Sequence, residues 1–249
     1  MKNKFIALLF VAISLQAHTL LAKNDSTSVI KNGIGLSIAP MISAPSFVNG
    51  SNYNNNYLKA GVGGTGGLCQ NIVLSKKQNF YLYAELGYQT SAYINNNMPN
   101  TLFLVNANGN VNYNNPRYFT LINRYNCGYF SLSIQKVLFH FGKKLGVFAG
   151  VGAQINYCYS TSQVVKNLLD TTGKDISSHY STTSYSVPQN IQWSAAAVAR
   201  IGLMANVTKH LTLNIAPVFN FGLNPKYIFT NNNPGFNSFG LNLQIMYSF

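Results

Sequence analysis

The sequence carries little charge: only 8% of its 249 residues are Asp, Glu, Lys or Arg, against about a quarter in an ordinary soluble domain. Acidic residues are fewer than basic ones, with four in the whole chain against 17. Long apolar runs are also missing, because nothing beyond the first residues approaches the ~20 apolar residues of a membrane-spanning helix. A soluble domain and a helical membrane protein are both poor fits.

Hydrophobic residues nevertheless make up 47% of the chain, and Tyr, Phe and Gly are abundant at 16, 16 and 20 residues. The mean hydropathy is only +0.06. Such a chain has too little charge for water and too much polarity for a bundle of membrane helices. This composition is typical of a transmembrane β-barrel.

The first residues indicate export. Lys2 and Lys4 precede an apolar run over residues 5–15, and small residues follow at Ala17 and Ala22. This pattern predicts a signal peptide over residues 1–22, followed by a periplasmic segment over 23–32 and a barrel domain over 33–249. An uncleaved anchor helix is the alternative, but the run is short for one. Export and the lack of a dense basic cluster argue against a nucleic-acid partner, although the net charge is +13.

Apolar and polar residues alternate along eight segments, as expected for strands with one apolar face. In the last segment, for example, Leu241, Leu243 and Ile245 alternate with Asn242 and Gln244. The polar faces hold Gly, Ser, Asn and Gln rather than charges, which suits a narrow lumen better than a water-facing surface. We therefore favour a barrel over a soluble sandwich, with strands at 33–40, 57–74, 80–92, 117–138, 145–158, 190–206, 211–222 and 237–249.

The connections between these segments alternate in length, long and then short, from the first to the last. Outer-membrane barrels have short periplasmic turns and longer outer loops. The chain is therefore predicted to be an all-β, eight-stranded antiparallel up-and-down transmembrane β-barrel of the bacterial outer membrane. Both chain ends should lie in the periplasm.

Three stretches resemble a known family: residues 81–88 (YLYAELGY), 146–153 (GVFAGVGA) and the ending 241–249 (LNLQIMYSF). They are similar to the small outer-membrane β-barrel proteins of the Bacteroidetes type, the PorT-like, porin-like group. The resemblance implies an integral outer-membrane protein, in some members with a role in protein secretion, and no shared catalytic residues. It also implies that Tyr247 and Phe249 form the terminal signal that the barrel-insertion machinery reads.

Two opposite charges are expected inside the lumen. Glu85 is the only carboxylate within a predicted strand, and Arg200 is the only basic residue placed on a lumen face near mid-membrane. Both should lie at similar depth, and an isolated charge there would be costly. We predict that they pair and plug the lumen, although separate partners such as Gln, Asn, Tyr or water are the alternative.

Cysteine pairing stays open, because the chain has three cysteines. A two-residue turn at Gly142 and Lys143 would pair Phe141 with Lys144 and place Cys127 opposite Cys158. The periplasm permits a disulfide between them, but this register makes the pair a hydrogen-bonded site, where disulfide geometry is harder to meet. We therefore favour three free thiols.

The third outer loop holds the one cluster that could carry catalysis: Asp170, Asp175, Ser177 and His179. Nothing in their spacing sets a base beside a nucleophile, so we expect a hydrated surface loop and no enzyme. No residues have the spacing of metal ligands, and no cofactor is expected. In the second outer loop, the apolar run at 102–105 is expected to pair within a hairpin that extends beyond the membrane, although an exposed binding surface is the alternative.

Lysines mark the short turns, at Lys76, Lys77, Lys143, Lys144 and Lys209. They are expected to contact the anionic headgroups of outer-membrane lipid, although solvated turns are nearly as good an explanation. We therefore predict a non-enzymatic barrel with a plugged lumen, whose loops serve binding or envelope assembly with an envelope or extracellular partner. A small passive pore, or an enzyme acting at the outer rim, is the alternative.

Overall fold

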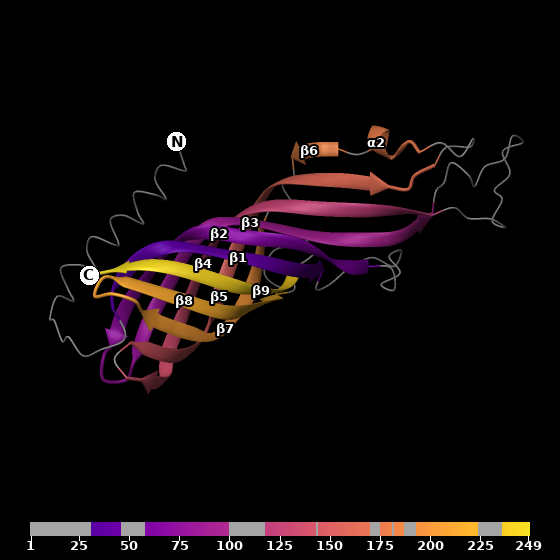
Figure 1. Cartoon of the computed structure of the whole chain (residues 1–249). Coiled ribbons are helices and arrows are strands. Elements are labelled where there is room, and N and C mark those ends of the chain that lie inside the picture. Colours follow the sequence, from indigo (N-terminus) through magenta and orange to yellow (C-terminus); the bar gives the residue numbers. More distant parts are fainter. Residues whose placement is uncertain are drawn as a thin grey trace, which may run out of the picture.

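The computed structural model describes residues 31–45, 58–99, 118–142, 144–169, 175–180, 182–186, 193–223 and 236–249. The regular elements within these ranges are β1 (Gly33–Pro45), β2 (Leu58–Ser75), β3 (Phe80–Pro99), β4 (Tyr118–Phe141), β5 (Leu145–Lys166), α2 (Ser177–Tyr180), β6 (Thr182–Ser186), β7 (Trp193–Asn206), β8 (Leu211–Gly222) and β9 (Phe236–Ser248). Figure 1 shows their arrangement.

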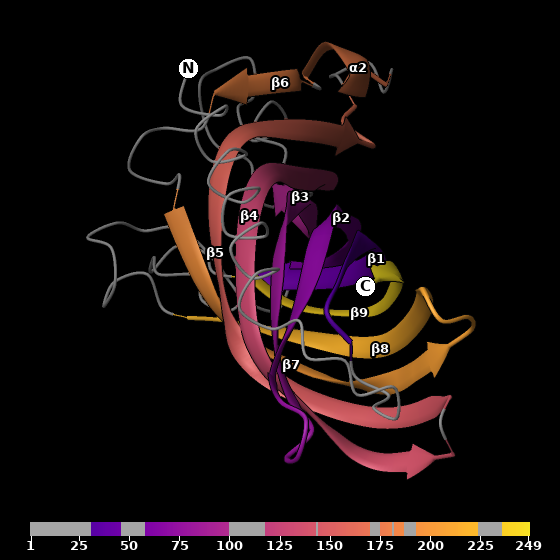
Figure 2. The same ribbon diagram turned by 90° about the vertical axis from the view of Figure 1, so that its left-hand side faces the viewer.

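Eight of these strands form a closed ring. Sequence neighbours pair antiparallel, β1 closes the ring against β9, and β4 pairs with β5. The sixth strand stands outside the ring and pairs only with β5. Figure 2 views the ring from the left-hand side of Figure 1. The predicted eight-stranded up-and-down barrel is therefore confirmed.

The alternation of side chains decides which face of each strand turns inward. In β7, Ser194, Ala196 and Arg200 are buried, whereas Ile201 and Leu203 are exposed. The same alternation runs along β8 and β9, as the sequence predicts. The barrel therefore has a largely polar interior and an apolar exterior, the reverse of a water-soluble barrel.

Strands β3 and β5 run well beyond the ends that their sequence pattern indicates. The predicted segments ended at residues 92 and 158, but β3 continues to Pro99 and β5 to Lys166. Cross-strand pairing continues with them, for Pro99 pairs with Tyr118 and Thr120 pairs with Lys166. Figure 1 shows this sheet reaching beyond the other strands. The predicted hairpin over residues 101–107 lies outside the described residues.

The third outer loop, predicted to be a hydrated surface loop, contains two short elements that the sequence pattern did not indicate, α2 and β6. Strand β7 pairs with β5 only as far as Tyr157, so the backbone of β5 beyond that point would lack a partner on this side. Strand β6 pairs there instead, with Thr161 opposite Tyr185, which satisfies backbone groups of the extended edge. Within the described ranges, no helix has the length and hydropathy to cross a membrane.

The described ends of the chain lie at the short-turn end of the barrel. The Phe249 amide donates a hydrogen bond to the Asn32 carbonyl (3.1 Å), and Lys31 Nζ donates to the Lys209 carbonyl in the turn between β7 and β8 (2.7 Å). The other two turns at this end connect β3 to β2 and β5 to β4. The described residues nearest to both chain ends therefore lie beside the short turns.

The wall leaves no room for a side chain at Gly152. A Cβ atom there would lie 2.1 Å from the Leu132 carbonyl oxygen and 2.5 Å from Ser133 Cβ. At Gly66 the nearest atom, the Ser37 carbonyl oxygen, would be 3.8 Å away, an ordinary contact.

We predict that Gly152→Ala lowers the free energy of unfolding by about 1–3 kcal/mol, because the methyl group forces neighbouring strands apart. Urea unfolding of the protein in lipid vesicles measures the change, and Gly66→Ala is the matched control, with an expected loss below ~1 kcal/mol. Equal losses in the two variants would mean that the wall is not closely packed at Gly152.

Candidate functional site in the barrel lumen

The centre of the lumen is crossed by an ion pair. Glu85 extends from β3 and Arg200 from β7, and Arg200 Nη2 lies 2.9 Å from Glu85 Oε2. Their side chains are 1% and 3% exposed, so the pair is shielded from bulk water. The structure thus brings together the two charges that sequence analysis placed at similar depth.

Three hydroxyl groups complete the environment of the carboxylate. Tyr83 Oη donates a hydrogen bond to Glu85 Oε2 (2.8 Å), and the hydroxyls of Ser37 and Tyr129 donate to Oε1. The Arg200 guanidinium also lies 4.4 Å from the centre of the Tyr83 ring, a cation–π distance. A buried ion pair is tolerated only when further hydrogen bonds satisfy it, and Glu85 meets this condition.

Sequence analysis did not assign these three hydroxyl residues to the ion pair. Their inward direction follows from alternation, and Tyr83 shares a face with Glu85. Ser37, on β1, and Tyr129, on β4, reach Glu85 only because the ring closes. No short-range pattern in the sequence predicts the contacts of Ser37 and Tyr129 with Glu85.

An apolar layer fills the lumen on the short-turn side of the ion pair. Its largest members are Tyr81, Phe148, Met204 and Met246, each at most 1% exposed. The rings of Tyr81 and Phe148 meet edge to face, with centroids 6.3 Å apart. The alternation pattern predicted small polar side chains along the lumen, and at this depth that prediction is wrong. Bulky side chains fill the space that the small residues of the wall leave.

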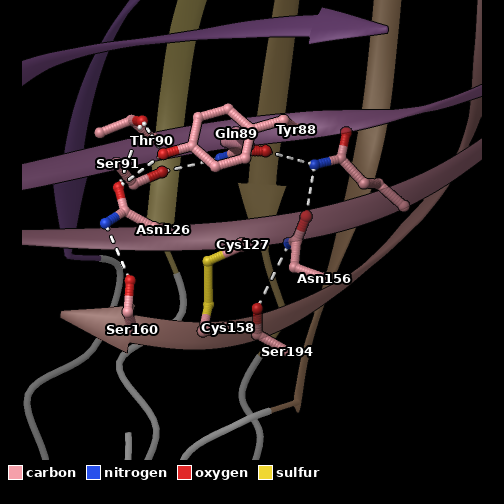
Figure 3. The surroundings of a disulfide bond; sticks show 11 residues. Tyr88, Gln89, Thr90, Ser91, Asn126, Cys127, Asn156, Cys158, Ser160 and Ser194 are labelled. Carbon is pink, nitrogen blue, oxygen red and sulfur yellow. Dashed lines mark hydrogen bonds between the residues drawn. A yellow bond between two sulfur atoms is a disulfide. The ribbon is translucent and has the colours of Figure 1, made fainter. Parts of the chain in front are cut away.

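An uncharged polar layer fills the lumen on the other side of the ion pair. Gln154 Nε2 donates hydrogen bonds to Gln89 Oε1 (2.6 Å) and Asn156 Oδ1 (2.7 Å), and Asn156 donates to Ser194 (3.3 Å). Figure 3 shows this chain of amides beside the disulfide. A small cavity adjoins it, lined in part by Asn220 and Ser238. The lumen therefore has three layers, apolar, charged and polar.

A disulfide joins Cys127 and Cys158 across β4 and β5 (Figure 3). Their Cα atoms are 3.9 Å apart, and both residues are buried on the lumen side of the wall. Cys69 is buried and free. The structure therefore contradicts the preference for three free thiols.

The reason lies in the register between β4 and β5. Phe141 pairs with Leu145 rather than with Lys144, so the predicted two-residue turn is wrong. A bulge between Val137 and Phe139 shifts the register back, and Cys127 still comes to face Cys158. A second bulge lies directly beside the cysteine pair, between Asn126 and Cys127. Bulges interrupt the regular ladder of hydrogen bonds. Cys127 and Cys158 therefore do not form the regular hydrogen-bonded pair in which a disulfide is harder to form.

The suggested catalytic cluster has structural partners instead. The Ser177 hydroxyl accepts a hydrogen bond from the Leu168 amide (2.8 Å), and Asp175 Oδ1 accepts one from the Ser177 amide (2.8 Å). Hydrogen bonds from the Ser177 side chain and then from its backbone hold the pKa of Asp175 below its ordinary value. These contacts cap the start of α2. Asp170 and the side chain of His179 lie outside the described residues.

The remaining predicted site residues lie at the short-turn end. Lys76, Lys77, Lys144 and Lys209 are exposed in the turns, whereas Lys143 lies outside the described residues. Tyr247 and Phe249 are exposed on the exterior, and the Tyr247 ring stacks on His210 with centroids 5.7 Å apart. In the part of the chain that the structure describes, no three His, Cys, Asp or Glu residues group as metal ligands would.

We predict that Glu85→Gln and Arg200→Met each lower the free energy of unfolding by about 3–5 kcal/mol, because each leaves a buried charge without its partner. The double variant should lose clearly less than the sum, since it buries no charge. A double-mutant cycle from urea unfolding in vesicles measures the coupling. Strictly additive losses would show that the two side chains do not interact.

The disulfide predicts the number of reactive thiols. After denaturation without reductant, only Cys69 should react with an alkylating reagent, and after reduction all three cysteines should react. Intact mass spectrometry counts the added groups. Three modified cysteines without reductant, in protein purified from an oxidising compartment, would contradict the disulfide.

Comparison with known proteins gives only distant likenesses. No family model and no curated protein sequence matches the chain. Among solved structures, Neisserial surface protein A has a TM-score of 0.42 at 10% identity and covers 88% of this chain and 97% of its own. The N-terminal β-barrel domain of Pseudomonas aeruginosa OprF gives 0.41 at 10% identity, and Ail, the attachment invasion locus protein of Yersinia pestis, gives 0.39 at 8%; each covers 88% of this chain and 100% of its own. At these low scores the barrel fold rests on its own strand pairing.

Proposed function

We propose that this chain is an integral outer-membrane β-barrel without enzymatic activity. Its lumen is plugged, and the loop end of its wall serves for binding or envelope assembly. The observation that carries the proposal is the closed ring, which buries the Glu85–Arg200 pair inside while apolar side chains cover the outside. A soluble protein would expose such a surface to water at great cost.

The apolar exterior has the height of a bilayer. Leu36, Val62, Val151 and Ile245 are between 58% and 74% exposed, on four different strands. On β4, the exterior between Arg124 and Lys136 carries no charge, and this stretch rises about 30 Å along the barrel axis at the usual strand rise and tilt. The hydrocarbon core of a bilayer is about 30 Å thick.

The three lumen layers favour a plugged barrel over a passive pore. The Glu85–Arg200 pair spans the lumen with its hydroxyl partners, and Tyr81 and Phe148 fill the next layer. Ions would have to cross both layers. The alternative of an enzyme is disfavoured because Ser177 and Asp175 cap α2 rather than face a base.

The proposed orientation is based on the two ends of the barrel. Short turns and the described ends lie together, so this end is proposed to face the periplasm after removal of residues 1–22. The lysines of the turns would then contact the headgroups of the inner leaflet, and Tyr247 and Phe249 would present the insertion signal. The secretion role implied by the PorT-like resemblance would place an envelope partner at the extended sheet or the loops.

Conductance in planar bilayers tests the plug. We expect the wild-type protein to give no stable open steps, because the charged and apolar layers block the path. Flotation of the same preparation with lipid vesicles is the control, since it shows that the silent protein has inserted. Stable open steps from inserted wild-type protein would assign the chain to the pores and overturn the plug.

A further inference from the structure

Three basic residues share the exterior face of the wall at its loop end. The register places Lys59, Ile94 and Ile122 in one row across β2, β3 and β4, and side chains in such a row point to the same face. Arg124 lies two residues along β4 from Ile122 and is exposed, while Asn123 between them is buried. Lys166 pairs with Thr120 and joins the same face. We call Lys59, Arg124 and Lys166 the loop-side basic patch.

The spacing of the patch suits a polyvalent anion. Lys59 and Arg124 stand on strands two steps apart, about 10 Å, and Lys166 lies four residues beyond the partner of Arg124, about 14 Å along β5. All three are exposed. The acids within the described residues are Glu85, which pairs with Arg200 in the lumen, and Asp175, which accepts a hydrogen bond from the Ser177 amide. No described acid therefore forms an ion pair with the patch.

Below the patch, the same face changes steadily from polar to apolar. The first level is a hydrogen-bonded group in which Asn126 Nδ2 donates to Ser160 (3.0 Å) and Tyr88 Oη donates to Asn126 Oδ1 (2.9 Å). Figure 3 shows these hydrogen bonds of Asn126 with Tyr88 and Ser160. Tyr88 and Tyr159 follow with ring centroids 6.3 Å apart, and Phe130 begins the apolar belt.

This order of cations, hydrogen-bonding groups, tyrosines and hydrocarbon matches the order of groups in a phosphorylated lipid. Tyr and Trp favour the level where headgroups meet acyl chains. An anion that binds the patch from a membrane can lay its chains on Phe130 and Ile155, which are exposed directly below. A water-soluble polyanion would use the cations but would leave that apolar surface uncovered.

We propose that the loop-side basic patch binds the phosphate groups of an anionic lipid in the outer leaflet. This inference rests on the proposed function, because it needs the barrel to span the membrane with its loops outside. The phosphates contact Lys59, Arg124 and Lys166, the hydroxyls of the headgroup meet Asn126 and its neighbours, and the chains lie on the apolar belt. The patch thereby fixes the depth of the extended sheet.

Native mass spectrometry of the refolded mature protein tests the site. The probes are a bisphosphorylated glucosamine-disaccharide lipid and the same lipid after dephosphorylation. We expect wild-type protein to prefer the phosphorylated form by about 100-fold, since each cation near an anionic surface contributes about fivefold. The variant K59Q/R124Q/K166Q should lose this preference, and the charge-conserving variant K59R/R124K/K166R should keep it.

Two further measurements define the source and the position of the site. R124Q alone should weaken binding about fivefold, while K136Q, which removes an exposed exterior cation near the other end of β4, should leave it unchanged. Inorganic phosphate in excess should not displace the lipid, because it gains nothing from the apolar belt. A soluble sulfated polysaccharide should bind more weakly than the lipid.

The outcomes separate this inference from the proposed function. If wild-type protein floats with vesicles but binds both lipids equally, or if the glutamine variant keeps the full preference, the patch is not a lipid site. Binding of the polysaccharide that depends on the three cations, without a lipid preference, would also overturn the inference. Failure of folded wild-type protein to float would instead refute the membrane barrel itself.

Discussion

The interior of a narrow closed barrel must be filled and satisfied by its own side chains, and the Glu85–Arg200 pair is where this requirement is strictest. Neither charge could be buried alone without a large penalty. The arginine, Tyr83 and two further hydroxyls surround one carboxylate. These contacts join β1, β3, β4 and β7, so a single cluster links strands on different sides of the ring.

The neighbouring layers follow from this arrangement. Bulky Tyr81 and Phe148 fill the lumen on the short-turn side, and a chain of amides fills it on the loop side. Small wall residues such as Gly152 let neighbouring strands approach closely. The disulfide lies at the level of the amides, next to Tyr157, where the pairing of β7 with β5 ends. It ties β4 to β5 where β5 loses β7 as its neighbour.

Much of this architecture could be predicted because alternation with period two is a local signal. It assigned the inward and outward faces, and counting residues from the short turns placed Glu85 and Arg200 at one depth. Strand ends beyond residues 92 and 158 could not be predicted, because outside a membrane both faces of a strand can be polar. Strand β6 was missed for the same reason.

Bulges are a second feature of the barrel that could not be predicted from the sequence. The turn after Phe141 has a different length from the predicted one, and the bulge near Leu138 corrects the offset. The sequence therefore predicted correctly that Cys127 lies opposite Cys158, but from a two-residue turn that the protein does not have. Whether a bulge compensates for the length of a turn depends on packing across the wall, and the alternation of residues in the sequence does not indicate it. Ser37 and Tyr129 were missed as partners of Glu85 because their contacts depend on closure of the ring.

The most direct measurement of the central claim is the contact between Glu85 and Arg200 in a lipid bilayer. Solid-state NMR on protein labelled with ¹⁵N in arginine and ¹³C in the glutamate carboxylate reports it through their dipolar coupling. Glu85 is the only glutamate of the chain and Arg200 its only arginine buried within the lumen among the described residues, so the assignment is simple. The account predicts a strong coupling, consistent with an N···O distance of 2.9 Å. Absence of coupling in folded, inserted protein would show that the charges lie apart and that the lumen is not closed by this pair.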